Sequence, residues 1–386
     1  MWQLGSFSAR LLFLLFVLPF LPSGELARYL FITSVAVLCG RVLLLGLDGE
    51  LPLVVRGEIG RARAFFPLIL VGWCLLSLIA LTGTGFEYGR WFLFAGLLGL
   101  ASAIGLYLGG IIRTISPADF ERLQNVPWII FGVATLSGKF TSAADLTVLR
   151  VVCLVAAQVF IVFKLRVYGL LSVTGIFQLF MQLRCILGKG WDKLISNLTL
   201  VGIMRGFILW PAILPVAPVM DDLAFAVACG EALWQLGMVF AHRRYAHYST
   251  GSDKNAEQGR GAVSSSVVLV IILVGASLVV IGLANAIAVF PKSQSVWLVS
   301  QAAVFYPMLC GYCVLRFLLW SIRKHEWLII AVQVGIIILQ GILVFFVDSV
   351  YWMSAAAIAT FFGLIMLSIL TIHATSDRNK AESLSL

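Results

Sequence analysis

The most constraining feature of the sequence is a succession of apolar runs, most of them long enough to cross a lipid bilayer, with short polar connections between them. A bilayer-spanning helix needs about 20 apolar residues. Hydrophobic residues make up 61% of the 386 positions and charged residues only 12%, and no soluble core can bury that much apolar surface. The sequence therefore predicts an all-α polytopic membrane protein.

Apolar runs bounded by charged residues, Pro and Gly predict about twelve transmembrane helices. The fifth run is short, which leaves its boundaries and those of the first run open. The polar segment from His242 to Ala262 is expected to form the longest loop. The twelve predicted spans cover residues 5–21, 27–47, 64–81, 91–112, 126–138, 146–163, 196–214, 223–240, 263–290, 297–320, 327–346 and 352–372.

A basic, moderately apolar stretch after the sixth span predicts two six-helix lobes. The N-terminal lobe would cover residues 1–167, a cytoplasmic linker or interfacial helix residues 168–195, and the C-terminal lobe residues 196–386. A short echo supports two halves: Leu18-Pro19-Phe20-Leu21-Pro22 recurs as Leu214-Pro215-Val216-Ala217-Pro218, although such turns also arise by chance in Leu-rich sequences. Two lobes of the same orientation would enclose a central cavity.

The distribution of basic residues predicts that both termini lie in the cytoplasm. With that orientation, eighteen Lys and Arg residues fall in the cytoplasmic connections and the C-terminal tail. Only five fall on the opposite side, where acidic residues such as Asp221 and Asp222 also lie. Those five are Arg28, Arg90, Lys139, Arg150 and Lys292.

Several classes of function are excluded by motifs that the sequence lacks. It has no P-loop, no dinucleotide fingerprint and no nucleophile elbow, and its seven Cys residues are scattered without metal-ligand spacing. The net charge of +9 is spread between the apolar runs rather than concentrated in a basic domain. We therefore expect no catalytic site, no cofactor, no metal and no nucleic-acid partner.

Charged residues inside the predicted spans are the candidate functional residues, because each costs about 3 kcal/mol at the bilayer centre. They are Arg10, Arg41, Arg205 and Arg316, with Glu231 as the one clear acid. Arg205 and Glu231 are expected at the same level on adjacent spans, which predicts an ion pair or a site of proton coupling. Arg41 and Arg316 lie nearer the inner ends, where extension of the side chain to the headgroups is the alternative.

If these arginines line a cavity, they select an anionic cargo. The planar guanidinium group binds phosphate through two parallel hydrogen bonds and stays charged at any physiological pH. Their excess over acidic groups in the spans therefore predicts a phosphate-bearing substrate.

The turn after the first span reads Leu21-Pro22-Ser23-Gly24-Glu25-Leu26-Ala27-Arg28-Tyr29, and the next span ends with Gly46-Leu47-Asp48-Gly49. This pattern, the twelve spans and the two halves resemble Wzx-type polysaccharide flippases of the multidrug/oligosaccharidyl-lipid/polysaccharide exporter superfamily. The resemblance implies translocation of undecaprenyl-diphosphate-linked oligosaccharide across the bacterial inner membrane. It also implies that Arg10, Arg41, Arg205 and, less closely, Arg316 are cavity cations that bind the substrate.

Two other functions remain open. A drug or small-metabolite exporter of the same fold predicts a neutral or acidic cavity. A membrane-embedded glycosyl- or acyltransferase predicts outer-loop acids that are required for a covalent product. For the flippase we expect a monomer that works in the lipid bilayer, beside polysaccharide polymerase machinery.

Overall fold

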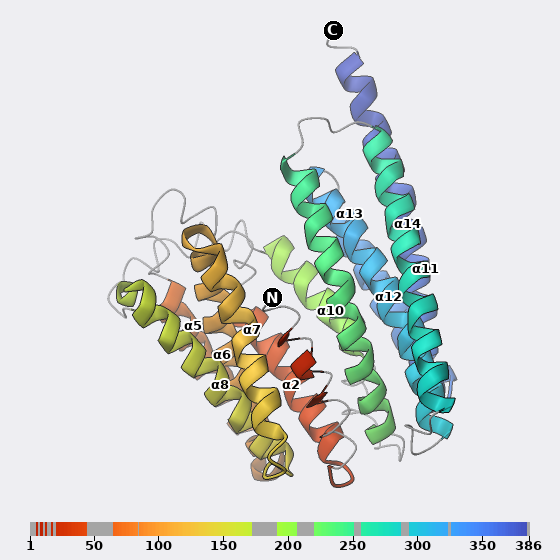
Figure 1. The fold of residues 1–386 in the computed structure, drawn as a ribbon. Coiled ribbons are helices and arrows are strands. Elements are labelled where there is room, and N and C mark those ends of the chain that lie inside the picture. The colour runs from red at the N-terminus through yellow and green to blue at the C-terminus, as the bar shows by residue number, and fades with distance from the viewer. Residues whose placement is uncertain are drawn as a thin grey trace. The chain divides into compact units, whose positions relative to one another are not determined.

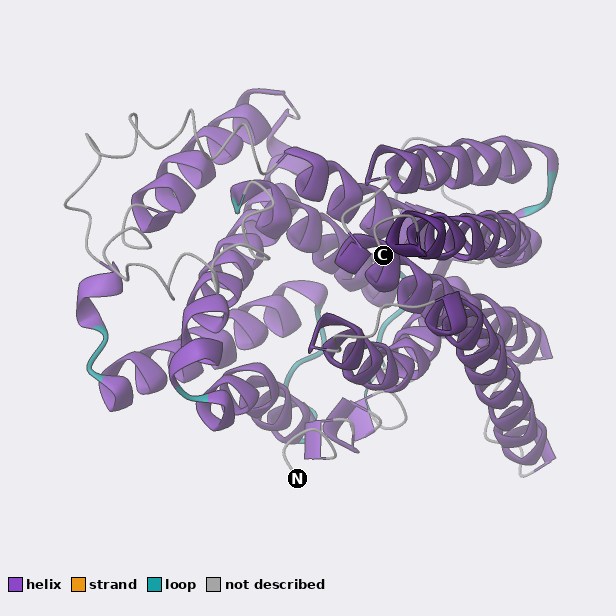
Figure 2. Ribbon diagram, turned by 90° about the horizontal axis from the view of Figure 1, so that it is seen from above, coloured by secondary structure: helices purple, strands orange, loops and turns teal. Residues whose placement is uncertain are grey.

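The computed structural model describes residues 5–6, 8–10, 12–13, 17, 21–44, 65–83, 85–171, 191–206, 220–250, 256–286, 293–322 and 326–383. These residues form helices and short connections without a strand, as Figure 2 shows. Seven of the helical segments are long and apolar enough to cross a membrane. The predicted class, an all-α polytopic membrane protein, is confirmed.

The chain divides into two compact units, unit 1 (Met1–Val201) and unit 2 (Gly202–Leu386). The division falls within a helix that covers residues 191–206. The predicted first and seventh spans lie only partly within the described residues, and the linker at residues 168–195 is described only at its two ends. The assignment of six helices to each lobe therefore stays a prediction.

Unit 1 is built around α6, which packs against α2, α5, α7 and α8. Its core contains Tyr107, Leu108 and Ile111, all fully buried. Helix α2 approaches α6 closely where Gly40 faces Gly99, since a side chain at Gly99 would collide with Cys39. The helices of unit 1 that Figure 1 labels are α2 (Glu25–Leu43), α5 (Phe65–Gly83), α6 (Gly85–Ile115), α7 (Pro117–Thr135) and α8 (Ala143–Leu165). A 3-10 turn, η3 (Tyr168–Leu171), follows α8.

Helix α7 corrects the predicted fifth span, which was placed at residues 126–138. The helix begins at Pro117, after an N-cap at Ser116, and already ends at Thr135. Its first turns carry charged residues, among them Asp119 and Arg122, so a search for apolar runs missed them. Ser116 and Pro117 supply the helix start signal, because a Ser side chain caps the first turn and Pro has no N–H to satisfy there.

Unit 2 is built around α12, which packs against all four other long helices of the unit. In the most apolar stretch of α12, 83% of the residues are buried, whereas in that of α11 only 17% are buried, so α12 lies at the centre of the unit and α11 at its surface. The elements are α10 (Met220–Thr250), α11 (Ala256–Ala286), α12 (Ser293–Ile322), α13 (Glu326–Phe346), a 3-10 turn η5 (Ser349–Tyr351) and α14 (Trp352–Ser383).

The predicted loop from His242 to Ala262 is wrong over most of its length. Helix α10 continues to Thr250 and α11 begins at Ala256. The helical ends in this segment include several Ala and Arg residues, which have high helix propensity. Polarity in this segment therefore does not mark the end of a helix.

Glycines fix the contact between α10 and α12. A side chain at Gly230 would collide with the ring of Tyr306, and one at Gly237 would collide with Cys310. The two glycines are seven residues apart and their partners four, so each pair lies on one face of its helix. Small residues let membrane helices approach closely, and van der Waals contact between them replaces the hydrophobic driving force that lipid does not supply.

Candidate functional site

The candidate site in unit 1 is an arginine–tryptophan cluster formed by Arg10, Arg150, Trp128 and Tyr29. The guanidinium carbons of Arg10 and Arg150 each lie 4.1 Å from the centroid of the Trp128 ring. Arg150 Nη1 also donates a hydrogen bond of 3.3 Å to Tyr29 Oη. Arg10, Arg150 and Trp128 are all half-buried. Three segments that are distant in sequence therefore bring two cations to one aromatic ring.

Packed aromatic rings support this cluster from one side. Phe131 contacts Trp128 edge-on at 5.8 Å and stacks on Tyr29 at 6.5 Å between ring centroids. Phe13 contacts both Tyr29 and Phe131, at 6.1 and 5.1 Å. Offset and edge-to-face ring pairs of this kind are favourable and restrict ring rotation. The Trp128 ring is thus held in place independently of the two arginines.

A carboxylate at the start of α2 sets the level at which the cluster forms. Glu25 Oε2 accepts a hydrogen bond of 2.7 Å from the backbone N–H of Ala143, the first residue of α8, and its Oε1 pairs with Arg28 at 2.5 Å. A carboxylate is favourable at a helix N-terminus, where backbone N–H groups lack partners. Because Glu25 joins the first turns of α2 and α8, Tyr29 and Arg150 come to similar depths.

Arg150 is a site residue that the sequence analysis placed wrongly. It was counted among the cations outside the membrane, but it lies seven residues inside α8, about 10 Å along the helix from Ala143. Its position four residues inside the predicted sixth span was the signal that could have placed it.

Arg41, a predicted cavity residue, lies apart from this cluster. It occupies the last turn of α2, where a cation is favourable beside the free carbonyl groups of the helix end. Twelve residues separate it from Tyr29 on the same helix, which is about 18 Å along the axis. The structure therefore brings Arg10 together with Arg150, and not with Arg41.

In unit 2 the structure pairs Arg205 with Glu231. Arg205 Nη2 lies 2.6 Å from Glu231 Oε1, and the two side chains are 7% and 18% exposed. The fully buried Tyr306 lies beside this pair, and its hydroxyl donates a hydrogen bond of 3.4 Å to the backbone carbonyl of Met204. Helix α10 can bring Glu231 this close because the preceding residue, Gly230, packs directly on the Tyr306 ring.

Arg316 is buried separately in α12 and is 5% exposed. Its guanidinium carbon lies 6.0 Å from the ring centroids of Phe317 and Trp320. Ten residues separate it from Tyr306, which is about 15 Å along the helix.

Unit 1 also contains a cluster of charged side chains near the connection between α6 and α7. The Asp119 carboxylate, 5% exposed, binds Lys164 Nζ at 2.5 Å and Arg122 Nη1 at 2.9 Å. The hydrogen bond from Lys164 is the main cause that lowers the pKa of Asp119, and Ser116 contributes as well. This cluster ties the start of α7 to the end of α8.

Both units therefore hold arginine side chains among their helices, and Glu231 pairs with Arg205. Two guanidinium carbons at 4.1 Å from one ring lie no more than about 8 Å apart, where like charges repel by about 2 kcal/mol at an effective dielectric constant of about 20. An anion that binds at the cluster relieves this repulsion. Among the described residues, no group of three or more His, Cys, Asp or Glu side chains could hold a metal ion.

Comparison with known proteins shows the fold. The chain is similar to the crystal structure of the eukaryotic MATE transporter AtDTX14, with 14% sequence identity and a TM-score of 0.50 over 99% of this chain and 91% of that one. No protein-family model matches the chain, and no curated protein is significantly similar to it in sequence.

Proposed function

We propose that the chain is an exporter that moves a polyprenyl-diphosphate-linked oligosaccharide from the cytoplasmic to the outer leaflet of a bacterial inner membrane. The observation that carries the proposal is the arginine–tryptophan cluster, which concentrates positive charge inside a helical membrane unit. The two units of a transporter fold supply the moving parts, and alternating access is a shift in population between inward-open and outward-open states. Both termini face the cytoplasm in this proposal.

The cluster suits a diphosphate for three reasons. A diphosphate carries several negative charges, so one guanidinium group cannot neutralise it. Guanidinium groups offer forked donors that match phosphate oxygens. The guanidinium carbons of Arg10 and Arg150 each lie 4.1 Å from the centroid of the Trp128 ring, so the two cations are close enough to bind one diphosphate together.

The Arg205–Glu231 pair supplies a second cation that is conditional. While Glu231 is ionised, it neutralises Arg205 at 2.6 Å. Displacement of Glu231 from Arg205 would leave this guanidinium group to an anion. In this proposal the pair either supports the structure of unit 2 or couples substrate binding to a proton, and the two roles are separated by measurement below.

A small-molecule exporter of the same fold is the second candidate, because the structural likeness is to a MATE transporter. The sign of the charge separates the two. Organic cations would be repelled by the arginine–tryptophan cluster, whereas a lipid diphosphate would be attracted to it. A substrate preference for cations would therefore favour the second candidate.

The test is transbilayer movement in vesicles that contain the purified protein. The probe is a polyprenyl-diphosphate carrying a fluorescent N-acetylglucosamine, and its arrival in the outer leaflet is followed by quenching with membrane-impermeant dithionite. A neutral polyprenyl glycoside with the same fluorophore is the comparison lipid. We expect rapid movement of the diphosphate probe only, and equal movement of both lipids, or none of either, would contradict the proposal.

Single variants Arg10→Gln and Arg150→Gln should each slow the diphosphate probe about tenfold or more, since hydrogen bonds to charged groups contribute about 1.5–3 kcal/mol. Arg113→Gln is a matched control, because Arg113 also lies over an aromatic ring, Phe120 at 5.7 Å, but on an exposed position outside the cluster. Its rate should equal that of the wild type.

A further inference from the structure

The Tyr29 hydroxyl is a hydrogen-bond donor that the protein does not use. It accepts a hydrogen bond of 3.3 Å from Arg150 Nη1, and it makes no other hydrogen bond among the residues that the structure describes. A tyrosine hydroxyl can accept and donate at the same time. Because buried polar groups are nearly always bonded, an unused donor inside a membrane unit indicates where a polar ligand binds.

Two other buried tyrosines use this proton within the protein. Tyr107 Oη donates to the Leu170 carbonyl at 3.1 Å, and Tyr306 Oη donates to the Met204 carbonyl at 3.4 Å. Tyr29 is also buried, with 4% of its surface exposed. The hydroxyls of Tyr107 and Tyr306 thus support the fold, whereas the proton of Tyr29 is left for an acceptor outside the described part of the chain.

The carboxylate on the same face of α2 is not this acceptor. Glu25 lies four residues before Tyr29, which places the two side chains on one face of the helix. Its Oε2 accepts from the Ala143 N–H at 2.7 Å, and its Oε1 pairs with Arg28 at 2.5 Å. Both oxygens of Glu25 are therefore engaged, and the proton of Tyr29 stays unused.

The Tyr29 ring is held in place independently of a ligand. It stacks on Phe131 with an angle of 10° between the ring planes, and it meets Phe13 edge-on at 6.1 Å between centroids. Fixed rings lose little conformational freedom when a ligand binds. Arg150 also polarises the hydroxyl, because successive hydrogen bonds strengthen one another. Tyr29 is thus a preorganised donor beside a guanidinium group.

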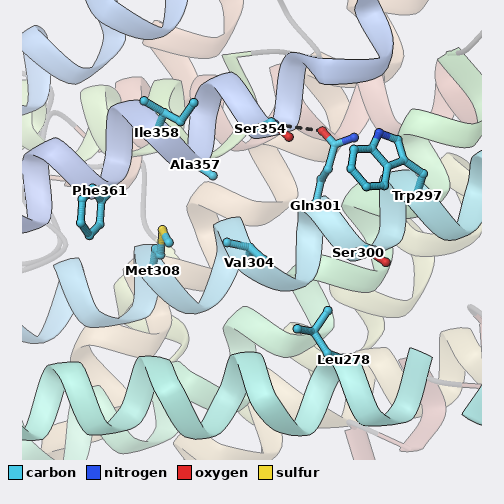
Figure 3. A pocket seen from close by; sticks show the side chains of 10 residues that line it. All are labelled: Leu278, Trp297, Ser300, Gln301, Val304, Met308, Ser354, Ala357, Ile358 and Phe361. Carbon is cyan, nitrogen blue, oxygen red and sulfur yellow. Dashed lines mark hydrogen bonds between the residues drawn. The ribbon is translucent and has the colours of Figure 1, made fainter. Parts of the chain in front are cut away.

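The groove of unit 2 shows the opposite arrangement. It has a volume of ≈ 490 Å³ and is lined by side chains of α11, α12 and α14. Figure 3 shows the bond between Gln301 on α12 and the backbone of Ser354 on α14, and the Gln301 amide also donates to the Val350 carbonyl at 2.7 Å. Ser300 Oγ donates to the Val296 carbonyl at 2.8 Å. Since these groups are bonded within the protein, we do not place a polar ligand there.

We propose that Tyr29 binds the substrate directly, and that its hydroxyl donates a hydrogen bond to a phosphate oxygen while it accepts one from Arg150. This inference rests on the proposed function and adds an uncharged donor to the two cations of the arginine–tryptophan cluster. A hydrogen bond to an anionic oxygen is stronger than one between neutral groups. It is also directional, so it fixes where the diphosphate lies against α2.

The first test is equilibrium binding of inorganic pyrophosphate and of polyprenyl-diphosphate to the detergent-purified protein. Tyr29→Phe should weaken binding about tenfold. The factor should be the same at low and high salt, because a hydroxyl carries no charge. Equal affinities of the wild type and Tyr29→Phe would overturn the proposal.

Tyr107→Phe is the matched control, since it removes the hydroxyl of a buried tyrosine in the same unit. That hydroxyl bonds to the Leu170 carbonyl, so its loss should lower the thermal midpoint of the unliganded protein by about 2 °C or more. Anion binding should stay unchanged. If Tyr107→Phe weakened binding as much as Tyr29→Phe, the effect would be one of general destabilisation and the proposal would be wrong.

A second cycle separates direct contact from an effect through Arg150. If Tyr29 only held Arg150 in place, Tyr29→Phe would change nothing once Arg150 is replaced by Gln. We expect a further loss of at least about threefold in the Arg150→Gln protein, because the hydroxyl still reaches the anion. No further loss there would count against direct contact.

A measurement on the wild type replaces these tests if Tyr29→Phe does not accumulate. In protein labelled with ring-deuterated tyrosine, the infrared difference spectrum on addition of pyrophosphate should show a shifted tyrosine C–O band, and Tyr107→Phe should show the same shift. An unchanged tyrosine spectrum would contradict the proposal.

The outcomes also separate this proposal from the proposed function. If the wild type moves the lipid diphosphate in vesicles and Tyr29→Phe binds it as tightly, the Tyr29 proposal is wrong and the proposed function stands. If the wild type binds pyrophosphate through Tyr29 but moves no lipid, the proposed function fails and the Tyr29 contact stands. If the wild type binds neither anion, both proposals are wrong.

Discussion

The Arg205–Glu231 pair yields the sharpest prediction on stability. Its nitrogen–oxygen distance is 2.6 Å and both side chains are largely buried. Charge centres about 4 Å apart attract by about 4 kcal/mol at an effective dielectric constant of about 20. Removal of one partner from a buried pair costs about 3–5 kcal/mol, because the other charge is left without compensation.

The two single variants should differ. After Arg205→Ala, Glu231 can take up a proton and become neutral, which limits the loss. After Glu231→Ala, Arg205 cannot lose its proton, so the whole cost of a buried charge remains. We expect a loss of about 2–3 kcal/mol for Arg205→Ala, about 3–5 for Glu231→Ala, and a coupling energy of at least about 2 kcal/mol in the double variant.

The assay is a double-mutant cycle of the unfolding free energy in mixed detergent micelles, followed by circular dichroism. Gln235→Ala, one turn further along α10, controls for the loss of a polar side chain on this helix. A coupling energy below about 0.5 kcal/mol would refute the reasoning, since that is the range of exposed pairs. If the double variant is stable but does not transport, the pair has a functional role as well as a structural one.

Three further predictions concern the supports of the two units. Asp119→Asn should reduce the unfolding free energy by about 1 kcal/mol at pH 7, because its partners are 39% exposed. The pKa of Asp119 is lowered in the folded protein, so this contribution to stability is fully present above the ordinary pKa of 3.8 and is lost as the pH falls through the folded pKa. The unfolding free energies of wild type and variant should therefore become equal only under strong acid. Glu25→Gln should cost about 1 kcal/mol by weakening the cap of α8 at Ala143, and hydrogen exchange should rise in the first turn of α8 and not at its far end. Gly230→Ala should lower the thermal midpoint by separating α10 from Tyr306, whereas Gly275→Ala, which has no neighbour within 4 Å, should leave it unchanged or raise it; equal midpoints for the two variants would count against the close helix contact.

Sequence patterns predict the helices of this protein well and their ends poorly. Apolar runs located the membrane segments, because an apolar segment in lipid must form its backbone hydrogen bonds internally and therefore folds into a helix. They missed the start of α7 at Pro117 and the extension of α10 to Thr250, since both segments are polar helices outside the apolar core. Helix signals such as the Ser116 cap are read from local chemistry and not from hydropathy.

The candidate site was predictable in part for a similar reason. Arg205 and Glu231 were expected at one level because their distances from adjacent helix ends could be counted. The approach of Arg10 to Arg150 could not be predicted by counting residues, because it depends on how the segment that carries Arg10 packs with α7 and α8 around Trp128. Residue spacing gives the depth of a side chain in the membrane, and packing decides which helices face each other.

The most direct test of the central claim is the equilibrium binding of polyprenyl-diphosphate to the detergent-purified protein at two salt concentrations. We predict that Arg10→Gln combined with Arg150→Gln weakens binding at least about tenfold, which is about 1.4 kcal/mol, and removes most of the salt dependence. The uncharged polyprenol should bind both proteins equally. An affinity for the diphosphate that is unchanged in the double variant would contradict the account.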